Sequence, residues 1–378
     1  MILTNCAACA APLAHDAPRC VRCKTRYCDS TCQHDHWRRG HKQICKKIHR
    51  GGNAEQYHAD NKYKEAVAVA VEKCANDTKG QTCYICTEAL HWKTTEGLVR
   101  GCACRGTAGF AHVSCLAEQA KILFAEVEEN NLDDKVKNAR WRRWRTCSLC
   151  EQSYHGVVQC SLGWACWKTY VGRPEEDQVR SFAMGQLGSG LSAAKNHKAA
   201  LSVREAELSL MMHLGDSKNN ILVAKGNMAS TYQQLGRFEP ALRMRREVYS
   251  GTLKLSGEEY RGTLIEANNY ASLLKRQNRF KEAKSLLLKT MPVARRILGD
   301  DHRLTIGMVG IYAQTVYLDT STSLDDIREA VTTLEETERT ARRVLGVEHP
   351  LTQGIDLDLR NLRTVLAGGT LPCNLHLH

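Results

Sequence analysis

The placing of cysteine and histidine is the feature that most constrains how this chain folds. Fourteen of its 18 cysteines fall in two blocks, residues 6–45 and 83–150. The amino terminus lacks the basic and apolar regions of a secretory signal, so we expect an intracellular protein of the cytoplasm or nucleus. Disulfides are rare in that reducing environment, and clustered cysteines there bind metal. The remaining four, which we expect to be inert thiols, are Cys74, Cys160, Cys166 and Cys373.

The first block, within residues 1–50, contains eight candidate metal ligands. Zinc prefers tetrahedral sets of thiolates and imidazoles, and closed sets of four make structural sites, so eight ligands predict two zinc ions. Two Cys-x2-Cys pairs can each present both sulfurs to one metal, and the later pairs are spaced four apart, as on one face of a helical turn. About 50 residues bury too small a core to fold alone, so the metal must supply folding free energy. The eight are Cys6, Cys9, Cys20, Cys23, Cys28, Cys32, His41 and Cys45.

The segment 27–33 (YCDSTCQ), followed by Trp37, His41 and Cys45, resembles a MYND zinc finger. The resemblance implies two interleaved zinc sites and a module that binds short proline-containing peptides. A cysteine-rich knot with disulfides is the alternative that the reducing compartment disfavours. The implied ligand sets are Cys6, Cys9, Cys28 and Cys32 for one zinc ion, and Cys20, Cys23, His41 and Cys45 for the other.

Residues 79–157 hold a second set of eight candidate ligands, which again predicts two closed zinc sites and brings the expected total to four ions. The eight are Cys83, Cys86, Cys102, Cys104, His112, Cys115, Cys147 and Cys150. The spacing of His112 and Cys115 suits a metal shared at the start of a helix over residues 116–127.

The segment 101–106 (GCACRG), with Phe110 and the run 112–116 (HVSCL), resembles a RING-CH finger. A PHD finger has the same ligand order but usually a different spacing around its second pair, so RING-CH is favoured. The resemblance implies a cross-braced arrangement of the two sites. One zinc ion would take Cys83, Cys86, His112 and Cys115, and the other Cys102, Cys104, Cys147 and Cys150.

RING-CH proteins are commonly ubiquitin ligases, which act by orienting a charged conjugating enzyme. The resemblance implies contacts to that enzyme from Ile85, from Leu149 and from a tryptophan such as Trp141 or Trp144. Three features depart from the pattern: the 31 residues between Cys115 and Cys147, the acidic Glu151, and the absence of the usual membrane helices. A finger kept for folding or docking is therefore the open alternative.

The rest of the chain is rich in leucine, alanine, arginine and glutamate with helical periodicity. We expect a linking helix over 51–78, a linker over 158–179, a repeat region over 180–367 and a tail over 368–378. Several motifs recur 42 residues apart, as Asn227 and Asn269 do, and Gly215, Gly257 and Gly299 keep the same step. Each unit is a pair of helices, and stacking of units creates the core that no unit has alone.

These repeats resemble the 42-residue tetratricopeptide repeat of kinesin light chains, through LG…HPLT in 345–352 and NYA…RF in 269–280. The expected units are 180–221, 222–264, 265–306 and 307–353, with a capping helix over 354–366. The resemblance implies a groove for a peptide, in which Asn227 and Asn269 match the asparagine that holds a peptide backbone, although both could simply face solvent.

Charge and composition argue against a nucleic-acid partner and against a membrane span. The formal net charge is +12, but four zinc–thiolate sites would lower it to about +6, which weakens the case for a nucleic-acid partner. The basic stretch 135–145 is better explained as a solvated helix whose tryptophans pack inward, and no run of residues is long and apolar enough to span a membrane. We therefore expect zinc-stabilised modules, a MYND finger and a RING-like cross-brace, followed by an all-α tetratricopeptide solenoid. The predicted function is a zinc-binding protein-interaction scaffold; the alternative is a ubiquitin ligase whose repeats select the substrate.

Overall fold

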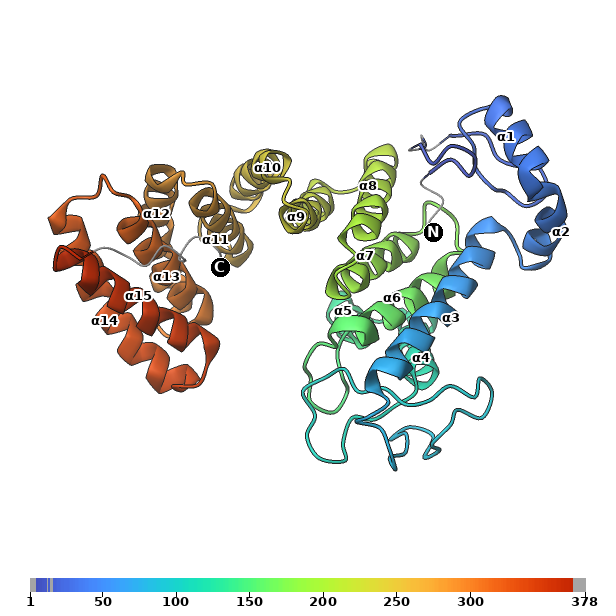
Figure 1. The fold of residues 1–378 in the computed structure, drawn as a ribbon, viewed down its shortest axis with the longest axis horizontal. Helices are drawn as coiled ribbons and strands as arrows, with labels where there is room; N and C mark the ends of the chain where they lie inside the picture. The colour runs from blue at the N-terminus through green and yellow to red at the C-terminus, as the bar shows by residue number, and fades with distance from the viewer. Residues whose placement is uncertain (1–4, 12, 14–15, 370–378) are drawn as a thin grey trace. The chain divides into compact units, whose positions relative to one another are not determined.

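A computed structural model describes residues 5–11, 13 and 16–369 (Figure 1). These residues are largely helical and contain three isolated β-bridges but no strand. The chain divides into two compact units at the junction of Asp216 and Ser217. The expected tail, 368–378, and the spare Cys373 lie almost wholly outside the described residues. The predicted fold class, small cysteine-rich zinc modules followed by a helical repeat region, is confirmed.

The first unit begins with a small helical module. Its helices are α1 (Ser30–His36), η1 (Trp37–His41) and α2 (Lys42–Arg50). Asp29 caps α1 by accepting a hydrogen bond from the backbone N–H of Cys32, so α1 starts between Cys28 and Cys32. The backbone kinks at Gly40, whose φ of 130° few side chains tolerate, and this kink turns α2 away from α1.

The expected linking helix is α3 (Ala54–Cys74), capped by Asn53. It does more than connect two fingers, because Tyr63, Val67 and Ala70 are buried in the main core of this unit. The second finger follows as a set of turns and then α4 (Val113–Glu129), α5 (Asp134–Trp141) and η2 (Arg142–Trp144). These three helices account for the unusually long stretch between Cys115 and Cys147.

The segment 158–179, expected to be a linker, is instead the centre of the first unit. It holds most of α6 (Gly156–Tyr170), which packs closely on α7 (Gln178–Ala193), and α7 in turn packs on α8 (His197–His213). Trp164, Cys166 and Trp167 are all buried. A helix that is apolar on every side shows no amphipathic periodicity, which is why the sequence pattern did not reveal it.

Glycines allow α6 and α7 to approach closely, and this contact can be tested. A Cβ added to Gly190 would lie 2.7 Å from the Gln159 carbonyl oxygen and 3.1 Å from the Cys160 Cα. We expect Gly190→Ala to lower the free energy of unfolding by about 1–3 kcal/mol, because backbone atoms cannot move aside easily. Denaturant titration measures this. The matched control is Gly172→Ala, where nothing lies within 4 Å; an equal effect of both changes would contradict the packing.

The second unit contains seven helices among its described residues. They are α9 (Lys218–Gln234), α10 (Phe238–Ser256), α11 (Arg261–Arg276), α12 (Phe280–Leu298), α13 (Arg303–Leu318), α14 (Leu324–Leu345) and α15 (Pro350–Leu366). The long helices α10, α12 and α14 each end at a glycine with positive φ: Gly257 and Gly299, which are 42 residues apart, and Gly346, which follows 47 residues later.

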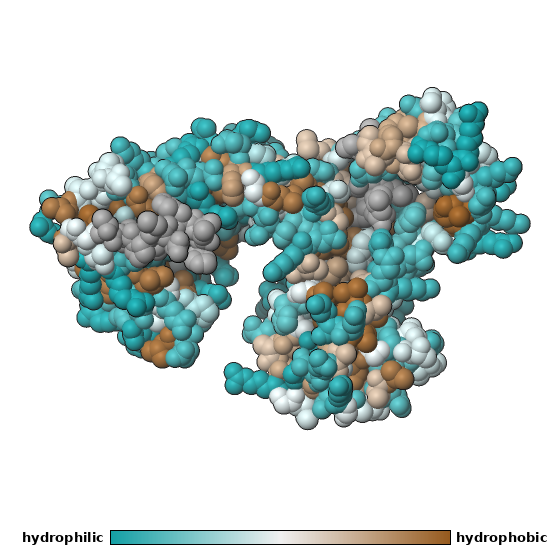
Figure 2. Space-filling view, viewed as in Figure 1, coloured by the Kyte–Doolittle hydropathy of each residue, from teal (hydrophilic) through white to brown (hydrophobic). Residues whose placement is uncertain are grey.

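The helix pairs match the expected units with two differences. The first helices α9, α11 and α13 begin four residues earlier than expected, and Ser217 and His302 cap the first and the last of them. The first expected unit, 180–221, corresponds to α7 and α8, which belong to the compact unit of the zinc fingers. The small residues Ala229, Ala271 and Ala283 are fully buried. No helix among the described residues has the length and apolarity needed to cross a bilayer, and the face in Figure 2 is mainly hydrophilic, with apolar residues in small patches.

Candidate metal centres

The structure gathers the sixteen predicted ligands into four separate quartets. Within each quartet the ligand atoms all lie within 4.8 Å of one another. The first finger brings together Cys6, Cys9, Cys28 and Cys32 (site 1), and Cys20, Cys23, His41 and Cys45 (site 2). The second finger brings together Cys83, Cys86, His112 and Cys115 (site 3), and Cys102, Cys104, Cys147 and Cys150 (site 4). In both fingers the pairs alternate along the chain, which is the interleaved arrangement that the two resemblances implied.

The distances between ligand atoms fit tetrahedral zinc. Two sulfurs bound to one zinc at about 2.3 Å lie about 3.8 Å apart at the tetrahedral angle. The Sγ atoms of Cys20 and Cys45 are 3.8 Å apart, as are those of Cys104 and Cys147. His41 Nε2 lies 3.3 Å from the sulfur of Cys23. Four ligands at these separations make a closed structural site, so the donor sets suit one zinc ion each.

The two histidines use different nitrogens. His41 directs Nε2 at its quartet, whereas His112 directs Nδ1, which lies 3.3 Å from the Cys86 sulfur. The other nitrogen of His112, Nε2, lies 3.4 Å from the carbonyl oxygen of Ala89. A hydrogen bond to that carbonyl fixes the tautomer that leaves Nδ1 free to bind metal.

A recurrent tight turn presents the Cys-x2-Cys pairs. In the turn that starts at Cys83, its N–H donates to the Glu88 carbonyl at 3.0 Å and its carbonyl accepts from the Thr87 N–H at 2.8 Å. Thr87 has a φ of 64°, a conformation that costs free energy for residues other than glycine. The same two backbone bonds and the same positive φ recur in the other Cys-x2-Cys turns, at Ala10, Lys24 and Glu151. Zinc bound at these turns would offset the free-energy cost of this conformation.

A fifth turn of this kind occurs at residues 91–96, where no Cys-x2-Cys pair is present. The His91 N–H donates to the Glu96 carbonyl at 3.0 Å, the Thr95 N–H donates to the His91 carbonyl at 2.8 Å, and Thr95 has a φ of 54°. His91 and Thr94 stand where the two cysteines would be. The Thr94 N–H donates to His91 Nδ1 at 3.2 Å, and the Thr94 hydroxyl lies 2.9 Å from the same nitrogen. Hydrogen bonds therefore close this turn in place of a metal.

The surroundings of the cysteines act on their thiol pKa values in opposite directions. Burial acts to raise the pKa of Cys6, but hydrogen bonds from the backbone, including that of Ala8, outweigh it and lower the pKa to about 6. Burial, with the nearby sulfurs of Cys6 and Cys9, raises the pKa of Cys32 to about 12. Zinc binds thiolates, so filling site 1 releases protons and acidification opposes it.

The predicted contacts to a conjugating enzyme divide between surface and core. Ile85 is 37% exposed and Leu149 is 52% exposed, each at the tip of a metal-binding turn. Trp144 is fully buried, so it is not available to a partner. Its ring lies among those of Trp141 and Tyr170, which explains why a basic helix carries two tryptophans: they pack inward, as expected. Nearby, Arg143 pairs with Glu151 at 2.8 Å.

Trp92, which the sequence pattern did not single out, is the exposed tryptophan of this finger. It is 71% exposed at the tip of the fifth turn, with the ammonium group of Lys93 4.7 Å from its ring centroid. Together with Ile85 and with Ile122 of α4 it lines a cavity of about 600 Å³ beside site 3. The only clue in the sequence was a tryptophan between two polar residues in a turn-rich segment.

In the repeat unit, Asn227 is exposed and Asn269 is half-buried. Both lie on first helices of their pairs, α9 and α11, at equivalent positions. Further along, a hydrogen-bonded network joins α11, α13 and α15, in which Lys275 of α11 donates to the side chain of Gln314. Gln314 of α13 donates to the Asp358 carboxylate of α15 at 2.9 Å, and the Tyr317 hydroxyl donates to it at 2.8 Å.

This network predicts a pH dependence. Burial raises the pKa of Asp358 to about 6, despite the hydrogen bonds from Gln314 and Tyr317. An unfolded aspartate titrates near pH 3.9, so the folded chain holds this proton more tightly. We expect the carboxyl's stabilising contribution to be complete below about pH 4 and to fall by roughly 2–3 kcal/mol as the pH rises through 6. Hydrogen exchange of α13 and α15 measures it. Asp358→Asn should abolish the dependence, and an unchanged profile would contradict the assignment.

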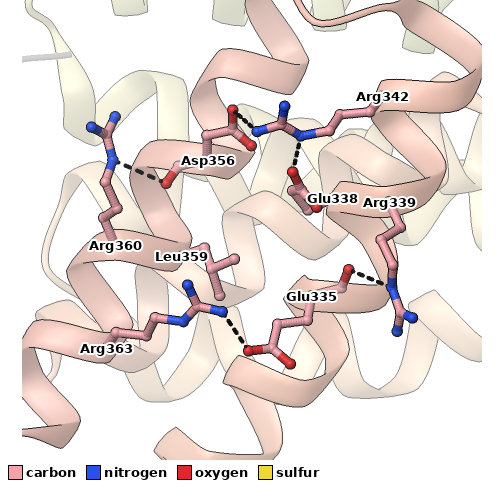
Figure 3. A pocket seen from close by; sticks show the side chains of 8 residues that line it. All are labelled: Glu335, Glu338, Arg339, Arg342, Asp356, Leu359, Arg360 and Arg363. Carbon is pink, nitrogen blue, oxygen red and sulfur yellow. Dashed lines mark hydrogen bonds and ion pairs between the residues drawn. The ribbon is translucent and has the colours of Figure 1, made fainter.

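A charged cavity of about 660 Å³ lies between α14 and α15 (Figure 3). Arg342 binds both Glu338 and Asp356, the latter at 2.8 Å, and Arg363 binds Glu335 at 2.7 Å. Exposed ion pairs contribute about 0–1 kcal/mol each to stability. These ion pairs therefore stabilise the packing of α15 on α14 only modestly.

Comparisons with known proteins identify two parts of the chain. A family model described as a MYND finger matches residues 6–45, and one described as a tetratricopeptide repeat matches residues 267–304. No curated protein sequence matches the chain significantly. A solved structure described as kinesin light chain nearly identical TPR-like repeats, from Podosopora anserina, is 14% identical, covers 61% of this chain and 97% of that chain, and has a TM-score of 0.43. BtubC (BKLC) from P. vanneervenii is 12% identical, covers 69% of this chain and 94% of its own, and has a TM-score of 0.38. The chain therefore carries a MYND finger and tetratricopeptide repeats.

Proposed function

We propose that this chain is an intracellular protein-interaction scaffold whose fingers are held by four zinc ions. The observation that carries the proposal is the composition of the quartets: each supplies four protein ligands, the number of a structural site. In this proposal zinc holds the two fingers folded, so that their surfaces can bind other proteins. MYND fingers and tetratricopeptide repeats generally bind proteins, and both are present in this chain.

Each part of the scaffold would take a different kind of segment. By its resemblance, the first finger would bind a short proline-containing peptide. The repeats would bind a peptide along their first helices, with Asn227 and Asn269 holding its backbone. Because the two recognition sites lie on one chain, a protein bound at one site is held at high effective concentration near the protein bound at the other.

A binding screen tests this function. The zinc-loaded full chain is titrated with libraries of proline-containing and of helical peptides, and binding is followed by fluorescence anisotropy. We expect chelation to abolish binding of the proline-containing class alone. Joint replacement of Asn227 and Asn269 by alanine should weaken the other class. Lys254→Ala on α10, a second helix of its pair, is the control that should change neither. Failure of both libraries to bind would contradict the scaffold.

A ubiquitin ligase is the second candidate, favoured by one specific observation. Ile85 and Trp92 are exposed beside site 3, next to the cavity that Ile122 also lines. An apolar surface at that place suits a conjugating enzyme. The test is an autoubiquitination assay across a panel of conjugating enzymes. Ubiquitination by the unchanged chain that is lost in Ile85→Ala, in Trp92→Ala and in Cys83→Ser would support a ligase. No ubiquitination with any enzyme of the panel would contradict the ligase and leave the scaffold as the proposed function.

A further inference from the structure

Site 1 differs from the other three sites in how much of it solvent can reach. Cys9 is exposed, Cys28 and Cys32 are at least partly exposed, and only Cys6 is buried. All four ligands of site 2, its neighbour in the same finger, are buried. In the second finger, site 3 has three buried ligands and site 4 has two.

Charge adds to this difference. With zinc bound, an all-cysteine site carries a charge of about −2 and a three-cysteine site about −1. Sites 1 and 4 are the all-cysteine sites, and site 1 is the more exposed of the two. Thiolate character and exposure together govern how readily a cysteine is oxidised. Charge and exposure therefore both single out the exposed sulfurs of site 1 as the most readily oxidised. Two of them, the Sγ atoms of Cys9 and Cys28, lie only 3.6 Å apart.

We propose that Cys9 and Cys28 form an oxidation site, at which a peroxide opens site 1 while the other three sites stay closed. This goes beyond the scaffold function and depends only on zinc occupancy. The Cys9 thiolate attacks the peroxide, its O–O bond breaks, and with one proton taken up the products are a sulfenic acid and water. The Cys28 thiolate then attacks the sulfenic sulfur, and a disulfide and a second water form as another proton is taken up.

The other two ligands complete the balance. Overall, hydrogen peroxide is reduced to two waters and two thiolates are oxidised to one disulfide. Cys6 and Cys32 remain, too few for a closed tetrahedral set, and each takes a proton as zinc leaves. A thiol reductant with zinc would reverse the change.

The contacts around site 1 limit what opens. The site joins the turn at residues 6–11 to the start of α1, where Cys32 lies. The buried cluster of this finger contains Tyr27, Ile48 and all three cysteines of site 2, but only Cys6 of site 1. Oxidation therefore replaces the four-ligand zinc link between this turn and α1 by the Cys9–Cys28 disulfide alone, and it leaves the centre of the finger in place.

The experiment follows zinc release and maps the oxidised cysteines in the same sample. The starting protein is the zinc-loaded full chain with Cys160→Ser and Cys373→Ser, which removes two thiols outside the sites. It is treated with equimolar hydrogen peroxide. We expect loss of about one of four zinc ions by native mass spectrometry. Digestion with trypsin and an enzyme that cleaves before aspartate separates Cys28 from Cys32 at Asp29, and fragmentation separates Cys6 from Cys9.

Two matched variants complete the design. Cys9→His keeps four ligands at site 1 but removes the exposed thiolate, so it should hold four zinc ions and release the first more slowly. Cys104→His makes the same change in site 4 and should leave the first release unaltered. A first disulfide in the second finger, loss of all zinc ions together, or equal protection by both variants would overturn the proposal. The peptide map of the starting protein decides the matter even if Cys9→His fails to bind zinc.

Discussion

Replacing Cys23 by serine should empty site 2 and unfold the first finger. Cys23 is fully buried and its sulfur lies 3.3 Å from His41 Nε2, so serine leaves three ligands in a site with no room for a replacement. A structural zinc ion contributes about 10–16 kcal/mol of apparent binding free energy in isolated fingers, as much as the whole stability of an ordinary domain. The apolar cluster of this finger is too small to compensate.

Native mass spectrometry and hydrogen exchange measure the outcome. We expect at least one zinc ion to be missing and the amides of α1 and α2 to lose protection, while α9 to α15 keep theirs. The control is Cys160→Ser, a half-buried cysteine outside the sites. Full zinc content in the Cys23 variant would contradict the assignment of site 2.

Replacing Trp144 by alanine should destabilise the first unit by about 3–5 kcal/mol, the usual cost of removing a buried aromatic side chain. Trp144 is fully buried among Trp141 and Tyr170, and Gln186 of α7 donates to its backbone carbonyl. The matched change is Trp92→Ala. Because Trp92 is 71% exposed, its loss should alter stability by no more than about 0.5 kcal/mol.

Denaturant titration of the two variants separates core from surface. If Trp144→Ala were neutral and Trp92→Ala costly, the packing of the second finger described above would be wrong. The same pair serves the ligase assay, because a partner contact should depend on Trp92 in a protein of unchanged stability.

The sequence predicted which side chains gather in quartets, because the chemistry of cysteine and histidine leaves few choices. Cysteines clustered at short, regular spacings in a reducing compartment commonly bind metal. The two resemblances then implied which four ligands share one zinc ion. The fifth turn shows the limit of that logic. His91 and Thr94 adopt the same backbone as Cys83 and Cys86, yet the spacing of a histidine and a threonine carries no metal signal.

Packing was harder to predict than ligation. α6 was expected to be a linker because a helix buried on every side has no amphipathic pattern, and its tryptophans at 164 and 167 could be placed only once α3 and α7 were known. For Trp144 the sequence supports two expectations, a contact to a partner and an inward-packed side chain, because tryptophan suits both an interface and a core; the structure shows the second. The expected repeat boundaries lie about four residues after the observed helix starts. The 42-residue step gives the length of a unit, but the capping residues decide where its first helix begins.

The central claim is that sixteen side chains hold four zinc ions and that these ions shape the two fingers. The most direct measurement is zinc content by native mass spectrometry, followed by hydrogen exchange of the same sample after exhaustive chelation. We expect about four zinc ions per chain before chelation, and afterwards loss of protection in residues 16–50 and 83–155 with protection retained in α9 to α15. A chain without zinc whose fingers keep their full protection would contradict the account.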